Sequence, residues 1–259
     1  MPTFLFNETV FGPVVSRRLG RSLGINLLPV NRKLCSFDCL YCECGLNPDK
    51  HAPKAVLPTR AEVYDKLEDK LLGMMEKNLP PDVITFAGNG EPTLHPEFPG
   101  IIDDTLLLRN KYCPNARVAV LSNATRISSP AVFKALLKVD DNIQKLDSAN
   151  EDTIRLLDRP LGHFDLKETV ENLKKFKGKV TIQTLFIKGS FNGHQIDNST
   201  DRELEPWLKL ISSIKPKEVM VYTIARDTPV NTLYKVDVQR LEEIALLLRQ
   251  NGIKVQVSE

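Results

Sequence analysis

The sequence lacks long hydrophobic runs and any strong excess of charge. No stretch approaches the roughly 20 apolar residues that a membrane-spanning helix needs, and the first residues, MPTFLFNETVFGPVV, lack the basic start and apolar run of a signal peptide. The formal net charge is only +2, so composition gives no case for a membrane or a nucleic-acid partner. We therefore expect a cytoplasmic protein without membrane association, and we leave binding to nucleic acid open.

Internal repeats, low-complexity tracts and linker-like stretches are also lacking. The chain has 259 residues, of which 42% are hydrophobic and 26% charged, as is ordinary for a folded protein with a well-buried core. A single domain over residues 1–259 is the simplest organisation.

Short apolar segments alternate with amphipathic ones along most of the chain. Near-continuous apolar strands separated by amphipathic helices indicate parallel βαβ units. The expected strands are 22–30, 82–88, 117–123, 142–150, 179–189, 217–225 and 253–259, and the expected helices are 59–78, 98–110, 129–138, 165–178, 201–215 and 236–252. Six strands before the terminal one fall short of the eight of a full TIM barrel. A partial barrel and an open doubly wound sheet are the candidates, and both bind ligands at the carboxyl ends of their strands.

Four of the five cysteines lie within ten residues, in the segment CSFDCLYCECG. Cys35, Cys39 and Cys42 are spaced C-x3-C-x2-C, and Cys44 follows two residues later. Thiols stay reduced in the cytoplasm, where clustered cysteines more often hold metals than form disulfides. A structural zinc site would usually show two separated C-x2-C pairs, which are absent. Four-cysteine ligation of an iron–sulfur cluster stays open, whereas three cysteines would leave one iron free for an outside ligand.

The pattern C-x3-C-x-aromatic-C, present as CSFDCLYC, resembles the motif of radical S-adenosylmethionine (radical SAM) enzymes. The resemblance implies that Cys35, Cys39 and Cys42 are the metal ligands of a [4Fe–4S] cluster and that S-adenosylmethionine binds the fourth iron. It further implies that Tyr41 packs beside the adenine and that Cys44 is spare. One electron from the cluster would cleave S-adenosylmethionine, and the 5′-deoxyadenosyl radical would abstract hydrogen from a substrate.

The same resemblance implies a fold and a redox partner. The family's partial (βα)6 barrel, a TIM-like α/β fold of parallel strands with outer helices, matches the strand count expected here. The cluster would need a one-electron reductant such as flavodoxin or ferredoxin. Cys113 stands alone, and no second cysteine cluster is present that could hold an auxiliary iron–sulfur cluster.

The turn AGNGEPT follows the second expected strand and supports the same interpretation. Gly88 and Gly90 would let the backbone approach a ligand closely, and Glu91 places a carboxylate that suits a cationic ammonium. The family carries a G-G-E-like motif here that binds the methionyl amino group, and Asn89 departs from it mildly. A plain glycine-rich turn is the alternative.

Polar residues also end the third and fourth expected strands. The resemblance implies that Ser122, Asn123, Lys145 and Asp147 bind the ribose and the methionyl carboxylate. Helix N-caps or surface turns are the competing interpretation, above all for the serine and asparagines.

Residues that could face a substrate are Gln183, within a strand, and Arg226, after the sixth strand. Arg17 and Arg18, with Arg21 close by, could clamp a phosphate or a carboxylate in bidentate fashion. A solvated charged face is the alternative for these arginines.

The segment GPVVSRRLGRSLGINLLP with the cysteine loop resembles an uncharacterised group of iron–sulfur oxidoreductases, distantly similar to the wyosine-forming tRNA-modifying enzymes. This resemblance does not fix the substrate. A tRNA base or nucleotide is one possibility, and a glycyl-radical partner protein that this chain would activate is another. A non-catalytic electron-transfer module, with all four clustered cysteines bound to its cluster, is the alternative from a different class.

Overall fold

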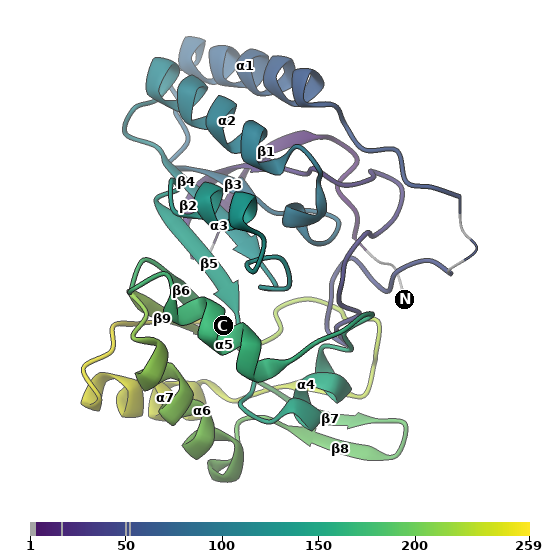
Figure 1. Cartoon of the computed structure of the whole chain (residues 1–259), viewed down its shortest axis with the longest axis vertical. Helices are drawn as coiled ribbons and strands as arrows, with labels where there is room; N and C mark the ends of the chain where they lie inside the picture. The colour runs from purple at the N-terminus through teal and green to yellow at the C-terminus, as the bar shows by residue number, and fades with distance from the viewer. Residues whose placement is uncertain (1–3, 17, 50, 52) are drawn as a thin grey trace.

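The computed structural model describes residues 4–16, 18–49, 51 and 53–259. Its main feature is one curled sheet of eight strands, in the order β1-β2-β3-β4-β5-β6-β9-β11 (Figure 1). Every neighbouring pair is parallel except β1–β2, which is antiparallel. These strands are β1 (Val10–Ser16), β2 (Gly20–Ile25), β3 (Val83–Phe86), β4 (Arg117–Ser122), β5 (Asp141–Lys145), β6 (Thr181–Leu185), β9 (Glu218–Tyr222) and β11 (Val255–Ser258).

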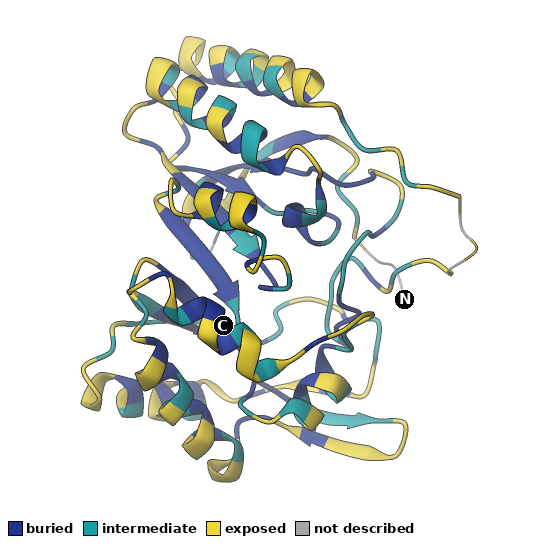
Figure 2. Cartoon of the chain, viewed as in Figure 1, coloured by how far each residue is buried: buried dark blue, intermediate teal, exposed yellow. Residues whose placement is uncertain are grey.

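Helices connect the parallel strands and cover the outer face of the sheet, with their exposed sides toward solvent (Figure 2). They are α1 (Arg60–Glu76), α2 (Phe98–Tyr112), α3 (Pro130–Leu136), α4 (Glu151–Leu157), α5 (Leu166–Lys174), α6 (Asp201–Ile214) and α7 (Val238–Gln250), with a short 3-10 helix, η1 (Pro92–Leu94). The predicted α/β partial barrel of parallel strands is therefore confirmed. None of the described helices is both long and apolar enough to cross a membrane.

Three features differ from the prediction. Strand β1 adds an antiparallel edge to the sheet. The expected strand 179–189 is divided, because the chain leaves the barrel after β6 and continues as β7 (Ile187–Phe191). With β8 (His194–Asp197) and β10 (Leu233–Lys235), β7 forms a small antiparallel sheet. The expected strand 142–150 ends at Lys145, and Asn150 begins α4 by accepting a hydrogen bond from the Asp152 amide.

Local sequence signals explain where α1 begins. The Thr59 hydroxyl accepts a hydrogen bond from the Glu62 amide (3.2 Å), and the Glu62 carboxylate accepts one from the Thr59 amide (2.7 Å). This capping box satisfies amides that the first turn of a helix leaves unpaired. The apolar stripe of α1 then buries Val63, Leu67 and Leu71 against the sheet.

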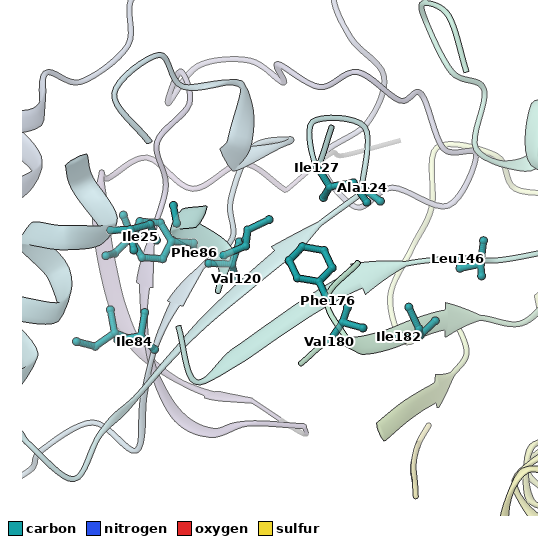
Figure 3. Packing of buried hydrophobic residues seen from close by; sticks show 14 of the residues in the cluster. Ile25, Ile84, Phe86, Val120, Ala124, Ile127, Leu146, Phe176, Val180 and Ile182 are labelled. Atoms are coloured by element: carbon teal, nitrogen blue, oxygen red, sulfur yellow. The ribbon is translucent and has the colours of Figure 1, made fainter. Parts of the chain in front are cut away.

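The core lies between the sheet and its helices. Ile25, Phe86, Val120 and Ile182 come from four parallel strands, are fully buried and point to the same side (Figure 3). Alternate residues of a strand point to opposite faces, so the neighbours of these residues line the concave side. There a second cluster of Leu19, Val83, Ala119, Ile143 and Met220 fills the amino-terminal end of the half-barrel. The space above that cluster, toward the carboxyl ends of the strands, is left for a site.

Candidate functional site

The cysteine loop lies between β2 and α1 and is held from two sides. Leu34 pairs with Gly90 in the turn after β3, in a parallel bridge. The Leu40 amide donates to the Leu157 carbonyl (2.9 Å) at the end of α4. These backbone contacts fix the loop between connections that follow β3 and β5. The loops that follow β2, β3 and β5 thus meet at the carboxyl edge of the sheet.

Gly90 has a conformation that this contact requires. Its φ of +139° is one that side-chain-bearing residues rarely adopt, and a Cβ atom would lie 1.9 Å from the Leu34 carbonyl oxygen. Glycine is therefore needed for the turn to approach the cysteine loop. The prediction of a close backbone approach at Gly90 agrees with this geometry, although the partner is the protein's own loop.

Cys35, Cys39 and Cys42 share one partly apolar environment beside Phe37 and Phe164. Burial raises the pKa of the Cys35 thiol to about 12 and that of Cys39 well above its usual value. In the absence of a metal, both thiols therefore hold their protons. A cluster that binds here displaces those protons, because thiolates are the metal-binding form.

Cys42 and Cys44 behave as a hydrogen-bonded pair. The hydrogen bond from Cys44 is the main cause that lowers the pKa of Cys42, and it raises the pKa of Cys44. The Cys44 sulfur also lies 3.4 Å from the Gly88 carbonyl oxygen, to which the thiol donates. Cys44 is thus directed at the glycine turn, unlike the three other thiols of the loop.

The donor set fits a [4Fe–4S] cluster with three protein ligands. The three thiols come from one short loop and pack in the same cluster, and all three are close enough to affect the pKa of the buried Lys33. Within the described part of the chain, no three His, Cys, Asp or Glu side chains are arranged to hold a single metal ion.

Lys33 is a site residue that the sequence analysis missed. Its ammonium group donates to the Gly45 carbonyl (2.9 Å) and lies 3.5 Å from the Asp38 carboxylate, with only 1% of its side chain exposed. Burial alone would lower its pKa, but the negative charge of neighbouring thiolates, above all that of Cys42, and of the Asp38 carboxylate raises it. Lys33 therefore places a positive charge beside the cysteines. Its position two residues before Cys35 does not distinguish it from a surface lysine in the sequence, so its burial could not be predicted.

The Glu91 carboxylate is buried at the start of η1. It accepts hydrogen bonds from the Asn123 amide (2.6 Å), the Thr93 amide (3.1 Å) and the Thr93 hydroxyl (2.5 Å). Burial raises its pKa despite these donors. The predicted ligand residues Glu91 and Asn123 are thus brought together from the ends of β3 and β4.

The end of β4 also contacts the cysteine loop directly. The Asn123 side-chain amide donates to the Ser36 hydroxyl (2.8 Å) and lies 3.5 Å from the Cys35 sulfur. The Ser122 hydroxyl accepts from the Ala124 amide (3.1 Å). Both predicted residues therefore lie in a buried turn after β4, and this turn lies against the cysteines.

Asn89 holds the N-terminal segment. Its side chain accepts from the Phe6 amide (2.9 Å) and donates to the Phe6 carbonyl (2.9 Å) and the Pro29 carbonyl (2.8 Å). The residue that departs from the family motif thus serves the protein's own backbone in this structure. This contact joins residues 83 positions apart, which sequence spacing alone could not predict.

Lys145 and Asp147 belong to a buried ionic group with Tyr41 and Asp158. The Lys145 ammonium pairs with Asp147 and lies 3.0 Å from Asp158, and the Tyr41 hydroxyl donates to both carboxylates. Burial lowers the pKa of Lys145, but the two carboxylates together raise it well above its usual value. Burial raises the pKa of Asp158 to about 7. The group anchors Tyr41, whose ring lies 4.5 Å from the ammonium.

Asp158 was missed because α4 was missed. The segment SANEDTIRLLD holds the signal that could have found it, since Asn150 is a favoured N-cap residue and two acidic residues follow in the first turn.

Of the described substrate candidates, Arg18, Gln183 and Arg226 lie near one cavity, whereas Arg21 does not. Arg18 donates to the Gln183 side-chain carbonyl (3.0 Å), which joins two predicted residues across the barrel. Arg226 pairs with Glu43 of the cysteine loop (2.6 Å). Arg21 donates to the Pro80 carbonyl (3.0 Å) at the far end of the strands. Arg17 lies outside the described residues.

Comparison with known proteins agrees with this geometry. The chain is 33% identical over 228 residues to a protein of Brachyspira hyodysenteriae named GTPase Obg, with 86% of this chain and 31% of that protein covered. It is 32% identical over 188 residues to the UPF0026 protein of Helicobacter pylori, with 70% and 56% covered. The chain thus spans about a third to a half of these two relatives. It contains no G-x-x-x-x-G-K-S/T motif, so the first name gives no reason to expect GTP hydrolysis here.

Solved structures show the same fold at low sequence identity. A radical SAM methyltransferase from Sphaerobacter thermophilus superposes with a TM-score of 0.66 and 16% identity, with 92% of this chain and 65% of that one covered. Streptococcus suis SuiB bound to S-adenosylmethionine gives 0.62 and 14%, with 88% and 49% covered. TYW1 with a lysine-pyruvate adduct gives 0.61 and 15%, with 89% and 74% covered.

The model of the Radical SAM superfamily matches residues 33–211, which include the cysteine loop, the turn after β3 and the ends of β4 and β5. The family predicted from the cysteine motif is confirmed, and with it the cofactors of that family, a [4Fe–4S] cluster and S-adenosylmethionine. This chain belongs to the radical SAM superfamily.

Proposed function

We propose that this chain is the catalytic unit of a radical SAM enzyme in which Cys35, Cys39 and Cys42 hold the [4Fe–4S] cluster. When bound and reduced, the cluster would supply the electron needed for reductive cleavage of S-adenosylmethionine, the chemistry by which hydrogen would be abstracted from the substrate. The observation that carries the proposal is the convergence of the three thiols with Glu91 and Asn123 at one edge of the sheet.

Three protein ligands, rather than four, are supported by the direction of the fourth thiol. Cys44 donates its single S–H to the Gly88 carbonyl (3.4 Å). For Cys44 to become a ligand, this contact would have to break. An electron-transfer module with a fully protein-bound cluster is therefore the weaker candidate.

Glu91 is the residue that we propose to bind the amino group of S-adenosylmethionine. An ammonium group stabilises a buried carboxylate, which otherwise has a raised pKa. The donors from Asn123 and Thr93 hold the carboxylate in one orientation. Asn123, Ser122 and the polar ends of β4 and β5 are the proposed groups for the ribose and the methionyl carboxylate.

Lys145 and Asp147 have a further role in this proposal. Because Lys145 is bound by two carboxylates, its ammonium stays protonated and is not a free amine nucleophile. Instead, this ionic group positions Tyr41, between Cys39 and Cys42, through its hydroxyl and its ring. The cysteine loop thereby keeps its place against α4.

The substrate is not given by this arrangement. A tRNA base or nucleotide and a glycyl-radical partner protein both remain candidates, and the likeness to TYW1, at 15% identity, supports the fold alone. A one-electron reductant of the flavodoxin or ferredoxin type is part of the proposal, because the cluster acts only when reduced.

The test is formation of 5′-deoxyadenosine. The protein is reconstituted anaerobically with iron and sulfide, mixed with dithionite and S-adenosylmethionine, and the product is measured by chromatography with mass detection. We expect product from the wild type and from Cys113→Ala, since Cys113 lies in the core away from the loop, and none from Cys39→Ala. A loaded wild type that forms no product, or a Cys39→Ala variant that forms as much, would refute the proposal.

A further inference from the structure

A cavity of about 650 Å³ opens inside the half-barrel beneath the cysteine loop. Its inner wall comes from the concave face of the sheet, with Ser22 on β2, Thr85 on β3 and Leu121 on β4. The opposite wall includes Phe4 and Phe6 of the N-terminal segment. This volume is in the range of sites that enclose a small organic molecule.

Arg18 reaches this cavity from the turn between β1 and β2 and is held in a fixed orientation. Its guanidinium lies over the ring of Tyr222, 4.4 Å from the ring centre, and donates to the Gln183 side chain (3.0 Å). A planar guanidinium that is held by stacking and one hydrogen bond keeps its other N–H groups available. Tyr222 in turn packs against an apolar cluster that includes Leu40 of the cysteine loop.

The charge of Arg18 is not neutralised by the protein. Among the described residues, no carboxylate lies within 4.0 Å of its guanidinium, and its side-chain partner is a neutral amide. Other charged groups at the cavity are Arg226 and Glu43, which neutralise each other, and Lys235 and Glu259. The guanidinium is half-buried at the wall of the cavity and forms no ion pair with the described residues, so its free N–H groups can donate to an anion that enters the cavity.

We propose that Arg18 binds an anionic group, a carboxylate or a phosphate, on a small organic substrate that occupies this cavity. The assignment of the cavity to the substrate rests on the proposed function. The anionic end lies at Arg18, and the rest of the molecule extends along the concave face toward the cysteine loop. Gln183 and Tyr222 are positioning residues, since they hold the guanidinium and not the ligand.

The test is direct binding of small anions to the reconstituted protein, without reductant and with saturating S-adenosylmethionine. Inorganic phosphate, pyrophosphate and acetate serve as probes in isothermal titration calorimetry. Tighter binding of the two phosphates would indicate a phosphate group on the substrate, and tighter binding of acetate would indicate a carboxylate. We expect saturable binding of at least one probe to the wild type, a loss of about tenfold or more in affinity for Arg18→Gln, and a smaller loss for Arg18→Lys, which keeps the charge but not the planar fork.

Arg21→Gln is the matched control, because Arg21 belongs to the same segment but lies outside the cavity. It should bind the probes as the wild type does. Circular dichroism checks that each variant is folded, and Arg18→Lys keeps the test valid if Arg18→Gln does not fold. No saturable binding to the wild type, or wild-type affinity in both Arg18 variants, would overturn the proposal.

Two further results would also overturn it. If the wild type binds the probes in a parallel titration without S-adenosylmethionine but not in its presence, Arg18 serves that cofactor rather than a substrate. If bulk tRNA displaces the probe at low salt, the anion belongs to a nucleic acid rather than a small molecule. Because the titration needs no cleavage of S-adenosylmethionine, its outcome is independent of the 5′-deoxyadenosine assay, and the two proposals can fail separately.

Discussion

Asn89 offers a quantitative test of how the N-terminal segment closes the cavity. Its side chain makes two hydrogen bonds to the backbone of Phe6, and the rings of Phe6 and Phe11 stack with their centres 3.7 Å apart. Asn89→Ala removes both of these hydrogen bonds, together with the one to the Pro29 carbonyl, which does not involve the N-terminal segment. Alanine fits the backbone here, because Asn89 is not among the residues with positive φ.

The expected effect follows from those two bonds. Each is worth about 1 kcal/mol, so the segment loses about 2 kcal/mol of stability relative to its open form. At about 1.4 kcal/mol per factor of ten, the open form becomes about 30-fold more populated. The stacking on Phe11 and the bond from the Phe4 amide to the Glu43 carbonyl (2.9 Å) remain, so the segment is loosened rather than detached.

Hydrogen exchange measured by mass spectrometry reports this opening. Peptides that cover residues 4–9 should exchange about 30-fold faster in Asn89→Ala, whereas peptides from α7 should not change. Asn172→Ala is the matched control, since Asn172 is a buried asparagine whose side chain bonds to Lys175 within the same helical region. Unchanged exchange in Asn89→Ala, or equal acceleration in Asn172→Ala, would refute the reasoning.

Three further predictions concern the core, the ionic group and the charge beside the cysteines. Leu71→Ala should lower the free energy of unfolding by about 2–5 kcal/mol, because Leu71 is fully buried. Leu72 is 41% exposed, so Leu72→Ala should change that free energy by about 0.5 kcal/mol or less. Equal losses for the two variants in urea denaturation would contradict the placement of α1. Tyr41→Phe should cost about 1–3 kcal/mol in the same assay, because two buried carboxylates lose a donor, and an unchanged midpoint would argue against that contact. Lys33→Met should lower the reduction potential of the cluster, because a nearby positive charge favours the more negative reduced form. The potential is measured in a redox titration followed by electron paramagnetic resonance, and Lys33→Arg, which keeps the charge, should retain it. An unchanged potential in Lys33→Met would show that the Lys33 charge does not act on the cluster.

The alternation of strands and helices was predictable because burial on both faces leaves a plain sequence pattern. Strands such as Val83–Phe86 are buried at every position, which distinguishes them from amphipathic helices such as α1. The capping box at Thr59 and Glu62 fixed the start of that helix from four residues. The division of residues 179–189 into β6 and β7 was not predictable, since the apolar run continues through Phe186 across the point where the chain leaves the sheet.

The candidate site was predictable where it is local in sequence and not where it depends on distant contacts. The cysteine spacing and the glycine turn are each contained in fewer than twelve residues. The partners of Lys145 are not, because Asp158 reaches it only through the placement of α4. The contact of Asn89 with Phe6 and that of Arg18 with Gln183 join segments 83 and 165 residues apart. Only the fold brings these residues together.

The central claim is that three thiols hold the cluster and leave one iron open to S-adenosylmethionine. Mössbauer spectroscopy of the protein reconstituted with isotopically enriched iron tests it most directly. The account predicts a cubane in which one of the four irons differs from the others and changes its signal when S-adenosylmethionine is added, in the wild type and in Cys44→Ala alike. Four equivalent thiolate-bound irons that ignore S-adenosylmethionine, or loss of the cluster in Cys44→Ala, would contradict it.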